Sequence, residues 1–187
     1  MTMNDLYIVA DIIDKTTWDT LKSYGRPRKV GKYTPPKDLY GLTYADLIEA
    51  QEIAKSNDIQ GLCRLILGMS GKEYGEADAA EVLAFSYWVA SELEAIGKLF
   101  ASLKVNPTAE QKKAGIDKLD FGLFGTLDWY CLRMGITDHS EAERVPWIRI
   151  YKCMQKDNEL TNFNDRLRKV YEQQSKQKQQ RRVSGKR

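Results

Sequence analysis

The chain holds a single histidine, and its neighbours are residue types that often assist a histidine in catalysis or metal binding. His139 lies in the segment ITDHSEAE, after Asp138 and before Glu141 and Glu143. Carboxylates beside an imidazole can orient it as an acid or a base, or share a cation with it. The segment also has the composition of a turn between two helices. We therefore interpret His139 as a capping or solvated turn residue.

The cysteines and glycines do not form a recognisable reactive pattern. Cys63, Cys131 and Cys153 are far apart, odd in number and each surrounded by apolar residues, which predicts buried thiols in a reducing compartment. The Gly68-Met-Ser-Gly71-Lys72 segment lacks the spacing and the following hydroxyl of a phosphate-binding loop. We predict a protein that is not an enzyme and that uses no metal and no cofactor.

The C-terminal segment 173–187 is basic and contains no acid. The chain as a whole has a formal charge of +3, and the segment holds six cations, which leaves −3 for residues 1–172. Val183 is its one apolar residue, so we predict a frayed helix end followed by a disordered tail. The tail is either a solvated terminus or a loose electrostatic arm for an acidic partner, RNA or DNA. Its cations are Lys176, Lys178, Arg181, Arg182, Lys186 and Arg187.

Length and composition are those of one soluble globular domain. The chain has 187 residues, of which 42% are hydrophobic and 29% charged. No apolar run approaches the roughly 18–20 residues of a membrane helix, and the N-terminus lacks the features of a signal peptide. We predict a cytosolic protein with an N-terminal segment and a basic, Pro/Gly-rich linker (1–41), a helical domain (42–172) and the tail (173–187).

The strongest predicted element is a long central helix over residues 79–103, opened by Asp78. Apolar residues recur there at steps of three and four, which lays one continuous stripe along the helix. The stripe comprises Val82, Phe85, Val89, Leu93, Ile96, Phe100 and Leu103. Further apolar residues broaden it, so we expect the helix to be buried on two sides or partly exposed for a partner.

Capping signals divide the rest of the domain into shorter helices. Thr43 is expected to cap a helix to about Ser56, and Asp58 one that Gly68 closes. We expect loops at 25–41 and 68–77, and a helix over 119–134. Further expected elements are a helix over 18–24 capped by Thr17, a capping box at 108–111, a helix from Pro146 to Lys156, and a last helix capped by Thr161 with the inner stripe Phe163, Leu167, Val170 and Tyr171.

These elements predict a mainly α fold, an irregular helical bundle built around the long central helix. Residues 6–13 are apolar and β-branched, which fits either a short N-terminal strand or a buried first helical turn. No internal repeat of 20–50 residues is present, which excludes a solenoid.

Three segments, in order, resemble the tail assembly chaperones of long-tailed bacteriophages. The first, DLYGLTYADLIEAQEI (38–53), is similar to the entry helix of that family. The second is DIQGLCRLILGMSG (58–71), followed by the acidic start of the long helix. The third, 120–170, opens on DFGLFGTLD, continues through a short helix ending in glycine and an acidic turn, and finishes with an F-x-x-R helix. Residues 1–37 lie outside the resemblance.

The resemblance implies a chaperone of the host cytoplasm that binds the hydrophobic helices of the tape-measure protein before tail polymerisation. An amphipathic groove with aromatic anchors suits that task. The candidate anchors are Tyr87, Trp88, Trp129, Tyr130, Trp147 and Tyr151, although each also fits an ordinary core position. Two alternatives stay open: a structural virion protein, such as a head–tail connector or tail-completion protein, and a small helical nucleic-acid-associated protein. Self-association is a further expectation.

Overall fold

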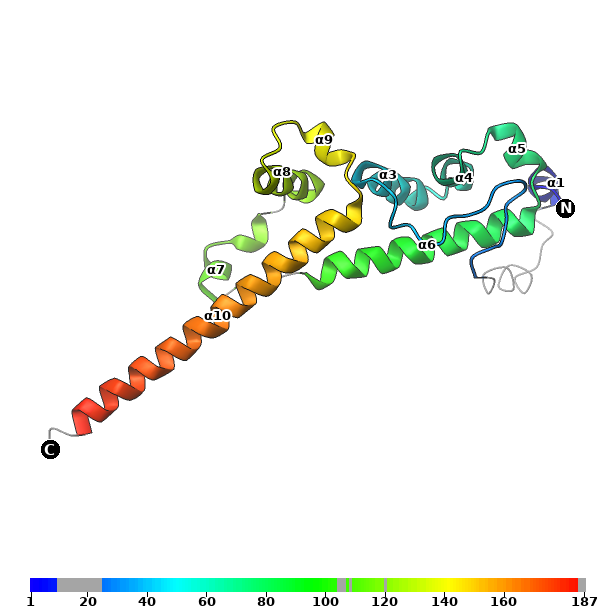
Figure 1. Ribbon diagram of the computed structural model, residues 1–187. Helices are drawn as coiled ribbons and strands as arrows, with labels where there is room; N and C mark the ends of the chain where they lie inside the picture. The colour runs from blue at the N-terminus through cyan, green and yellow to red at the C-terminus, as the bar shows by residue number, and fades with distance from the viewer. Residues whose placement is uncertain (10–24, 104–106, 108, 120, 185–187) are drawn as a thin grey trace.

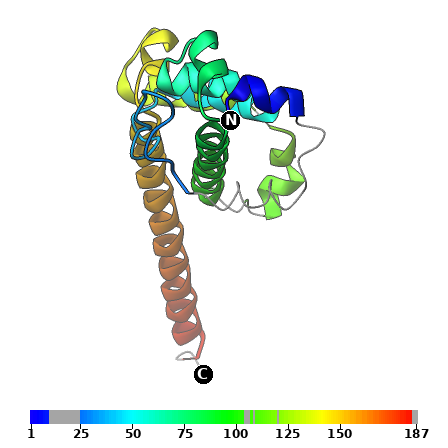
Figure 2. The ribbon, with the colours of Figure 1, turned by 90° about the vertical axis from the view of Figure 1, so that its right-hand side faces the viewer.

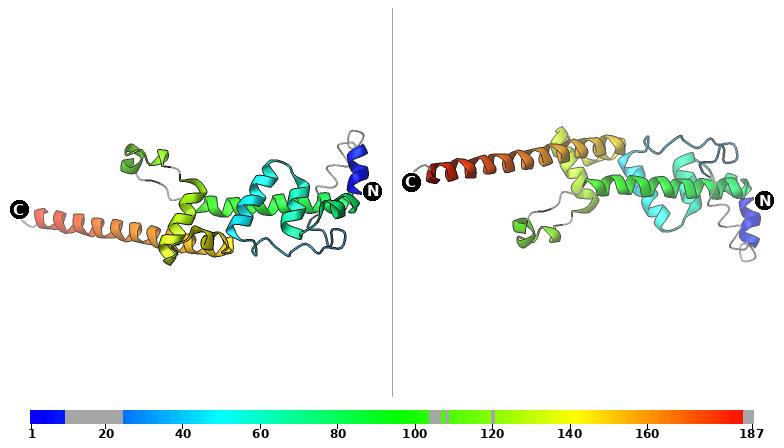
Figure 3. Two further views of the ribbon diagram at one scale, coloured as in Figure 1. Left: turned by 90° about the horizontal axis from the view of Figure 1, so that it is seen from above. Right: turned by 90° about the horizontal axis from the view of Figure 1, so that it is seen from below.

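The computed structural model describes residues 1–9, 25–103, 107, 109–119 and 121–184, and these form an elongated, mainly α-helical molecule. Residues 1–9 and the end of the last helix at Ser184 lie at opposite ends of its long axis (Figure 1 and Figure 3). β-structure in the described residues is limited to isolated bridges, which pair Thr2 with Asp78, Val30 with Tyr33 and Thr43 with Pro146. The prediction of a mainly α fold is confirmed.

The long central helix, α6, spans Ala79–Ser102, as its apolar stripe predicts. Asp78 is the N-cap, and its carboxylate accepts hydrogen bonds from the amides of Ala80 and Glu81. Five stripe residues are buried in the core, whereas Phe100 and Leu103 at its end are only partly buried. The buried five are Val82, Phe85, Val89, Leu93 and Ile96.

Helices α3 (Tyr44–Lys55) and α4 (Ile59–Leu67) lie against α6, on the side that Figure 1 shows above it. Their predicted caps are confirmed. Thr43 and Asp46 form a reciprocal capping box, and Asp58 accepts a hydrogen bond from the amide of Gly61. Gly68 ends α4 with φ of 68°, a left-handed conformation that glycine adopts without the strain other residues incur.

The predicted loop over 68–77 is wrong, because it contains a short helix, α5 (Gly71–Glu76). The side chain of Ser70 accepts a hydrogen bond from the amide of Glu73, whose carboxylate accepts one from the amide of Ser70. This capping box offsets the low helix propensity of Gly71 and Gly75. Gly75 also lets Asn4 approach, since a Cβ there would lie 2.7 Å from Asn4 Oδ1.

For residues 6–9 of the predicted N-terminal element, the helical alternative is confirmed and the strand is wrong, whereas residues 10–13 lie outside the described residues. Helix α1 spans Met3–Val9 and packs on α5 and α6 through the buried Met3 and Leu6. Thr2 and Asp5 cap it through reciprocal hydrogen bonds. The predicted helix over 18–24 and its cap lie outside the described residues.

Residues 25–41 form the predicted loop, but the loop is packed on the helical body. Val30 and Leu39 are almost fully buried. The carboxylate of Glu73 accepts a hydrogen bond from the Tyr33 hydroxyl and pairs with Lys32 at 2.5 Å. Bonds from Lys32 and Ser70 hold the pKa of Glu73 well below its usual range. These contacts tie the loop to α5.

The chain after α6 forms α7 (Ala109–Lys113), the 3₁₀ turn η2 (Ile116–Lys118), α8 (Gly122–Met134) and α9 (His139–Glu143). Helix α8 begins at Gly122 rather than at the predicted residue 119, and it ends as predicted at Gly135, which has φ of 67°. Thr108, the first residue of the predicted capping box at 108–111, lies outside the described residues.

The last element, α10, is one continuous helix from Trp147 to Ser184, so the predicted break at Lys156 and the cap at Thr161 are wrong. No glycine or proline lies within these bounds, and Thr161 is an exposed residue in the middle of the helix. The half of α10 that follows Thr161 projects away from the body (Figure 1 and Figure 2). The predicted inner stripe is accordingly exposed at Phe163, Val170 and Tyr171 (51, 46 and 60%).

The predicted disordered tail begins as part of this helix. Residues 173–184 are helical, and 185–187 lie outside the described residues. Glutamine, lysine and arginine have good helix propensity, which favours continuation in the absence of a breaker.

Truncation after Glu172 is expected to leave the melting temperature unchanged within about 2 °C. Side chains 173–178 are exposed, so their removal uncovers no described core residue. Thermal unfolding followed by circular dichroism measures this. A truncated chain that unfolds several degrees earlier would show that the end of α10 docks on the body.

Candidate helix-binding groove

The aromatic residues predicted as partner anchors fall into two groups. Trp147 and Tyr130 are 0 and 1% exposed and belong to the core, so they cannot contact a partner in this conformation. The indole N–H of Trp147 donates a hydrogen bond to the carbonyl of Leu39 over 2.8 Å. The remaining four are half-buried and pack around the core: Tyr87, Trp88, Trp129 and Tyr151.

The first residues of α3 and α10 are held side by side. The amide of Tyr44 donates to the carbonyl of Val145 (2.9 Å), and the amide of Trp147 donates to the carbonyl of Leu42 (3.1 Å). Between these two bonds, Thr43 and Pro146 form the antiparallel bridge. This short pairing fixes the corner from which α3 and α10 diverge.

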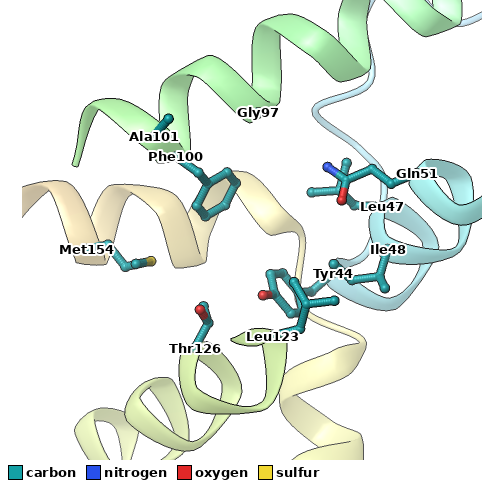
Figure 4. A pocket seen from close by; sticks show the side chains of 10 residues that line it. All are labelled: Tyr44, Leu47, Ile48, Gln51, Gly97, Phe100, Ala101, Leu123, Thr126 and Met154. Atoms are coloured by element: carbon teal, nitrogen blue, oxygen red, sulfur yellow. The ribbon is translucent and has the colours of Figure 1, made fainter. Parts of the chain in front are cut away.

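An open apolar groove lies where α3, α6, α8 and α10 converge (Figure 4). Its volume is about 370 Å³. Figure 4 shows side chains from all four helices around it. They are Tyr44, Leu47, Ile48 and Gln51 from α3, Gly97, Phe100 and Ala101 from α6, Leu123 and Thr126 from α8, and Met154 from α10.

The groove has a buried floor and an exposed rim. Tyr44 and Leu47 are 3 and 1% exposed, whereas Leu123 is 47% exposed. Gly97 leaves one wall open, because a Cβ at that position would meet no atom within 4 Å. Burial raises the pKa of the Tyr44 hydroxyl, and its hydrogen bond with Thr126 acts in the opposite direction. The hydroxyl is therefore neutral at physiological pH.

The chemistry of the lining is that of a binding surface. None of its ten residues is charged, and none is a histidine or cysteine. The polar groups are the amide of Gln51 and the hydroxyls of Tyr44 and Thr126, which can orient a bound group by hydrogen bonding. An apolar groove with a few polar groups suits the anchor side chains of a partner.

His139 lies away from this groove and joins α8 to α9. Its ring stacks on Phe124 with centroids 5.2 Å apart, and its Nε2 lies 3.5 Å from Asp128 Oδ1. Asp138 caps α9, and its bonds to Ser140 lower its pKa. Within the described residues, no group of three or more His, Cys, Asp or Glu side chains is placed to hold a metal ion.

The cysteines are free thiols, and two of the three are buried. Burial raises the pKa of Cys63 to about 12, and it also raises the pKa of Cys131. Both thiols are therefore protonated at neutral pH, which makes them poor nucleophiles. Cys153 is half-buried on α10.

The cations of the predicted tail divide by position. Lys176 and Lys178 are exposed on α10. Arg181 and Arg182 lie in its last turn, and Lys186 and Arg187 lie outside the described residues.

Comparisons with protein-family models, with curated proteins and with solved structures found no match to this chain. The described helices also lack the combination of length and apolar character that crossing a bilayer requires.

The sequence does not reveal the groove. Its lining extends from residue 44 to residue 154 and becomes continuous only when four helices pack together. Ile48, Phe100 and Met154 each appear as ordinary core positions in their own helices. The one local signal is Gly97, a glycine in the middle of a strongly helical segment, which indicates a packing or binding reason for its small size.

Proposed function

We propose that this chain is a non-enzymatic protein-binding protein that holds an amphipathic helix of a partner in the groove between α3, α6, α8 and α10. The observation that carries the proposal is the open apolar lining, with Leu123 exposed on the rim and Gly97 leaving one wall open. An uncharged groove without a nucleophile favours binding over catalysis.

A helix is the occupant that best suits these dimensions. The volume of about 370 Å³ is near the lower end of ligand pockets, which span about 300–1,000 Å³. Such a space receives a few anchor side chains rather than a large cofactor. A partner helix presents apolar anchors at i, i+3, i+4 and i+7, and its backbone polar groups are already satisfied internally.

The resemblance to tail assembly chaperones supplies a biological setting for this binding. In that setting the partner is the tape-measure protein, whose hydrophobic helices must be shielded from water in the host cytoplasm until the tail polymerises. An apolar groove is physically suited to the task, because it hides apolar side chains that would otherwise drive aggregation. Mass spectrometry of purified particles separates this role from that of a structural virion protein, which remains in the particle.

Leu123→Asp is expected to weaken binding of an amphipathic helix at least about tenfold. The probe is a fluorescent designed peptide with leucine and phenylalanine at i, i+3, i+4 and i+7, and the readout is fluorescence anisotropy. A carboxylate on the rim must lose water when the groove fills, whereas Leu123 is exposed enough for the substitution to leave the fold intact.

Two further variants sharpen the test. Gly97→Leu fills the open wall without adding charge and raises helix propensity, so it should also weaken binding. Leu132→Asp is the matched control, since Leu132 lies on α8 outside the groove lining and is 77% exposed. Equal affinities for Leu123→Asp, Gly97→Leu and Leu132→Asp would contradict the proposal.

A further inference from the structure

Two helical segments carry large apolar side chains that remain about half exposed or more in the described chain, although His139 stacks on one of them, Phe124. The three most exposed at α8 are Phe121, its N-cap residue, and Phe124 and Leu132 within the helix, with exposed fractions of 70, 64 and 77%. Together with Asp128 we call these residues the α8 face. On α10 the exposed apolar residues run from Leu160 (50%), just before the projecting half, through Phe163 and Val170 to Tyr171 within it. Together with Leu167 we call these residues the arm face.

Three residues of each face follow one another at the same spacing along their helix. Phe124, Asp128 and Leu132 follow one another at i, i+4 and i+8, and so do Phe163, Leu167 and Tyr171. Each set therefore forms a stripe about 12 Å long on one side of its helix. Phe121 lies directly against Gly125, because a Cβ added at Gly125 would come within 2.6 Å of the Phe121 Cβ. This contact places Phe121 beside the first turn of α8, where it extends the α8 face.

The α8 face lies in acidic surroundings. Residues 121–143 contain four carboxylates and one arginine, a formal charge of −3. The arginine, Arg133, is already paired with Asp157 of α10. Asp128 lies within the face itself, 3.5 Å from His139, and the other carboxylates belong to α9 and its cap: Asp138, Glu141 and Glu143.

The arm face lies in basic surroundings. Residues 160–178 contain five cations and two acids, a formal charge of +3. At about 100° per residue, Arg166 and Arg168 flank the apolar stripe, and Lys178 continues its line one heptad after Tyr171. The two acids, Asp165 and Glu172, are on the opposite side, where both lie within 4 Å of Arg168 (3.6 and 3.9 Å).

The arm face cannot reach the α8 face of its own chain, because α10 is a straight, continuous helix that carries it away from the body (Figure 1 and Figure 2). Folding back would require a break in a segment that has no glycine or proline. Pairing of two arm faces would bring two segments of charge +3 together, which is unfavourable. The acidic, apolar α8 face of another copy fits the arm in both charge and length.

We propose that the α8 face of one copy receives the arm face of a second copy. This contact joins two different surfaces, so it closes if two copies exchange arms reciprocally and otherwise extends into an open chain. It is independent of the groove, whose lining residues belong to neither face. High salt should weaken the contact, because opposite charges surround its apolar centre.

Sedimentation velocity over a range of concentrations tests the proposal, with Leu132→Asp altering the α8 face and Phe163→Asp altering the arm face. Wild type is expected to self-associate, and each variant should raise the dissociation constant at least about tenfold. Both positions are exposed, so helicity should be unchanged. Asn162→Asp adds the same charge on the back of α10 and should associate like wild type.

Mixing the two variants is the decisive experiment. The Leu132→Asp variant retains a normal arm face, and the Phe163→Asp variant retains a normal α8 face. An equimolar mixture should therefore form a one-to-one complex, held by a single contact between these two normal faces. A Leu132→Asp variant that still self-associates would overturn the proposal in favour of arm–arm pairing. A wild-type chain that stays monomeric throughout, whether or not it binds double-stranded DNA through the arm, would also overturn it.

Discussion

Val89→Asp is expected to lower the free energy of unfolding by about 4 kcal/mol or more, enough to unfold a marginally stable domain. Val89 is 0% exposed and lies in the middle of α6, on the stripe that packs against the core. An aspartate there would lose its hydration without gaining a partner. Urea unfolding followed by circular dichroism measures the change.

Two comparisons separate the buried charge from simpler effects. Val89→Ala removes volume without charge and should cost only about 2 kcal/mol. Ala90→Asp places the same charge at the next position, which is exposed, and should cost less than about 1 kcal/mol. If Val89→Asp unfolded at the same urea concentration as Ala90→Asp, this side of α6 would not be core.

Trp147→Ala should cost about 3–5 kcal/mol, because it empties the largest fully buried site in the described residues and leaves a carbonyl without its donor. The ring contacts Tyr40, Phe100 and Tyr151 at centroid distances of 5.5, 5.9 and 6.3 Å, which joins α10 to α6 and to the 25–41 loop. The indole N–H also holds the carbonyl of Leu39.

Trp147→Phe tests the hydrogen bond with a smaller loss of volume. We expect it to cost about 1–3 kcal/mol, between wild type and Trp147→Ala. The same urea titration applies, and the three remaining tryptophans, Trp18, Trp88 and Trp129, report fluorescence. A Trp147→Phe chain as stable as wild type would show that the bond to Leu39 contributes nothing to the fold.

Helix starts and ends can be predicted from the sequence where they depend on only a few neighbouring residues. Thr43, Asp58 and Asp78 cap the helices that they are predicted to cap, and Gly68 and Gly135 end theirs. Each rests on hydrogen bonds or backbone angles within one turn of helix, so no knowledge of the tertiary fold is needed.

The errors arose where two local signals competed. Glycines at 71 and 75 favoured a loop, but the capping box at Ser70 outweighed them and formed α5. Thr161 resembled a cap, yet α10 passes through it because no breaker precedes it. The apolar spacing after Thr161 was correctly identified as a helical stripe, but periodicity cannot say whether a stripe faces the core or the solvent.

The groove and the pairing of surfaces depend on tertiary structure. The aromatic anchors predicted from residue type include Trp147 and Tyr130, which are buried, whereas the exposed rim residue of the groove is Leu123. Residue type alone favours tryptophan and tyrosine as anchors, but exposure decides which side chains a partner can reach.

The most direct test of helix binding is site-specific photocrosslinking of the designed amphipathic peptide. A benzoylphenylalanine side chain replaces Leu123 in one sample and Leu132 in another, so that the two probes lie on α8 inside and outside the groove lining. The account predicts that the peptide crosslinks efficiently at position 123 and only weakly at 132, and that unlabelled peptide competes at 123. Equal crosslinking at both positions, or none at 123, would contradict it.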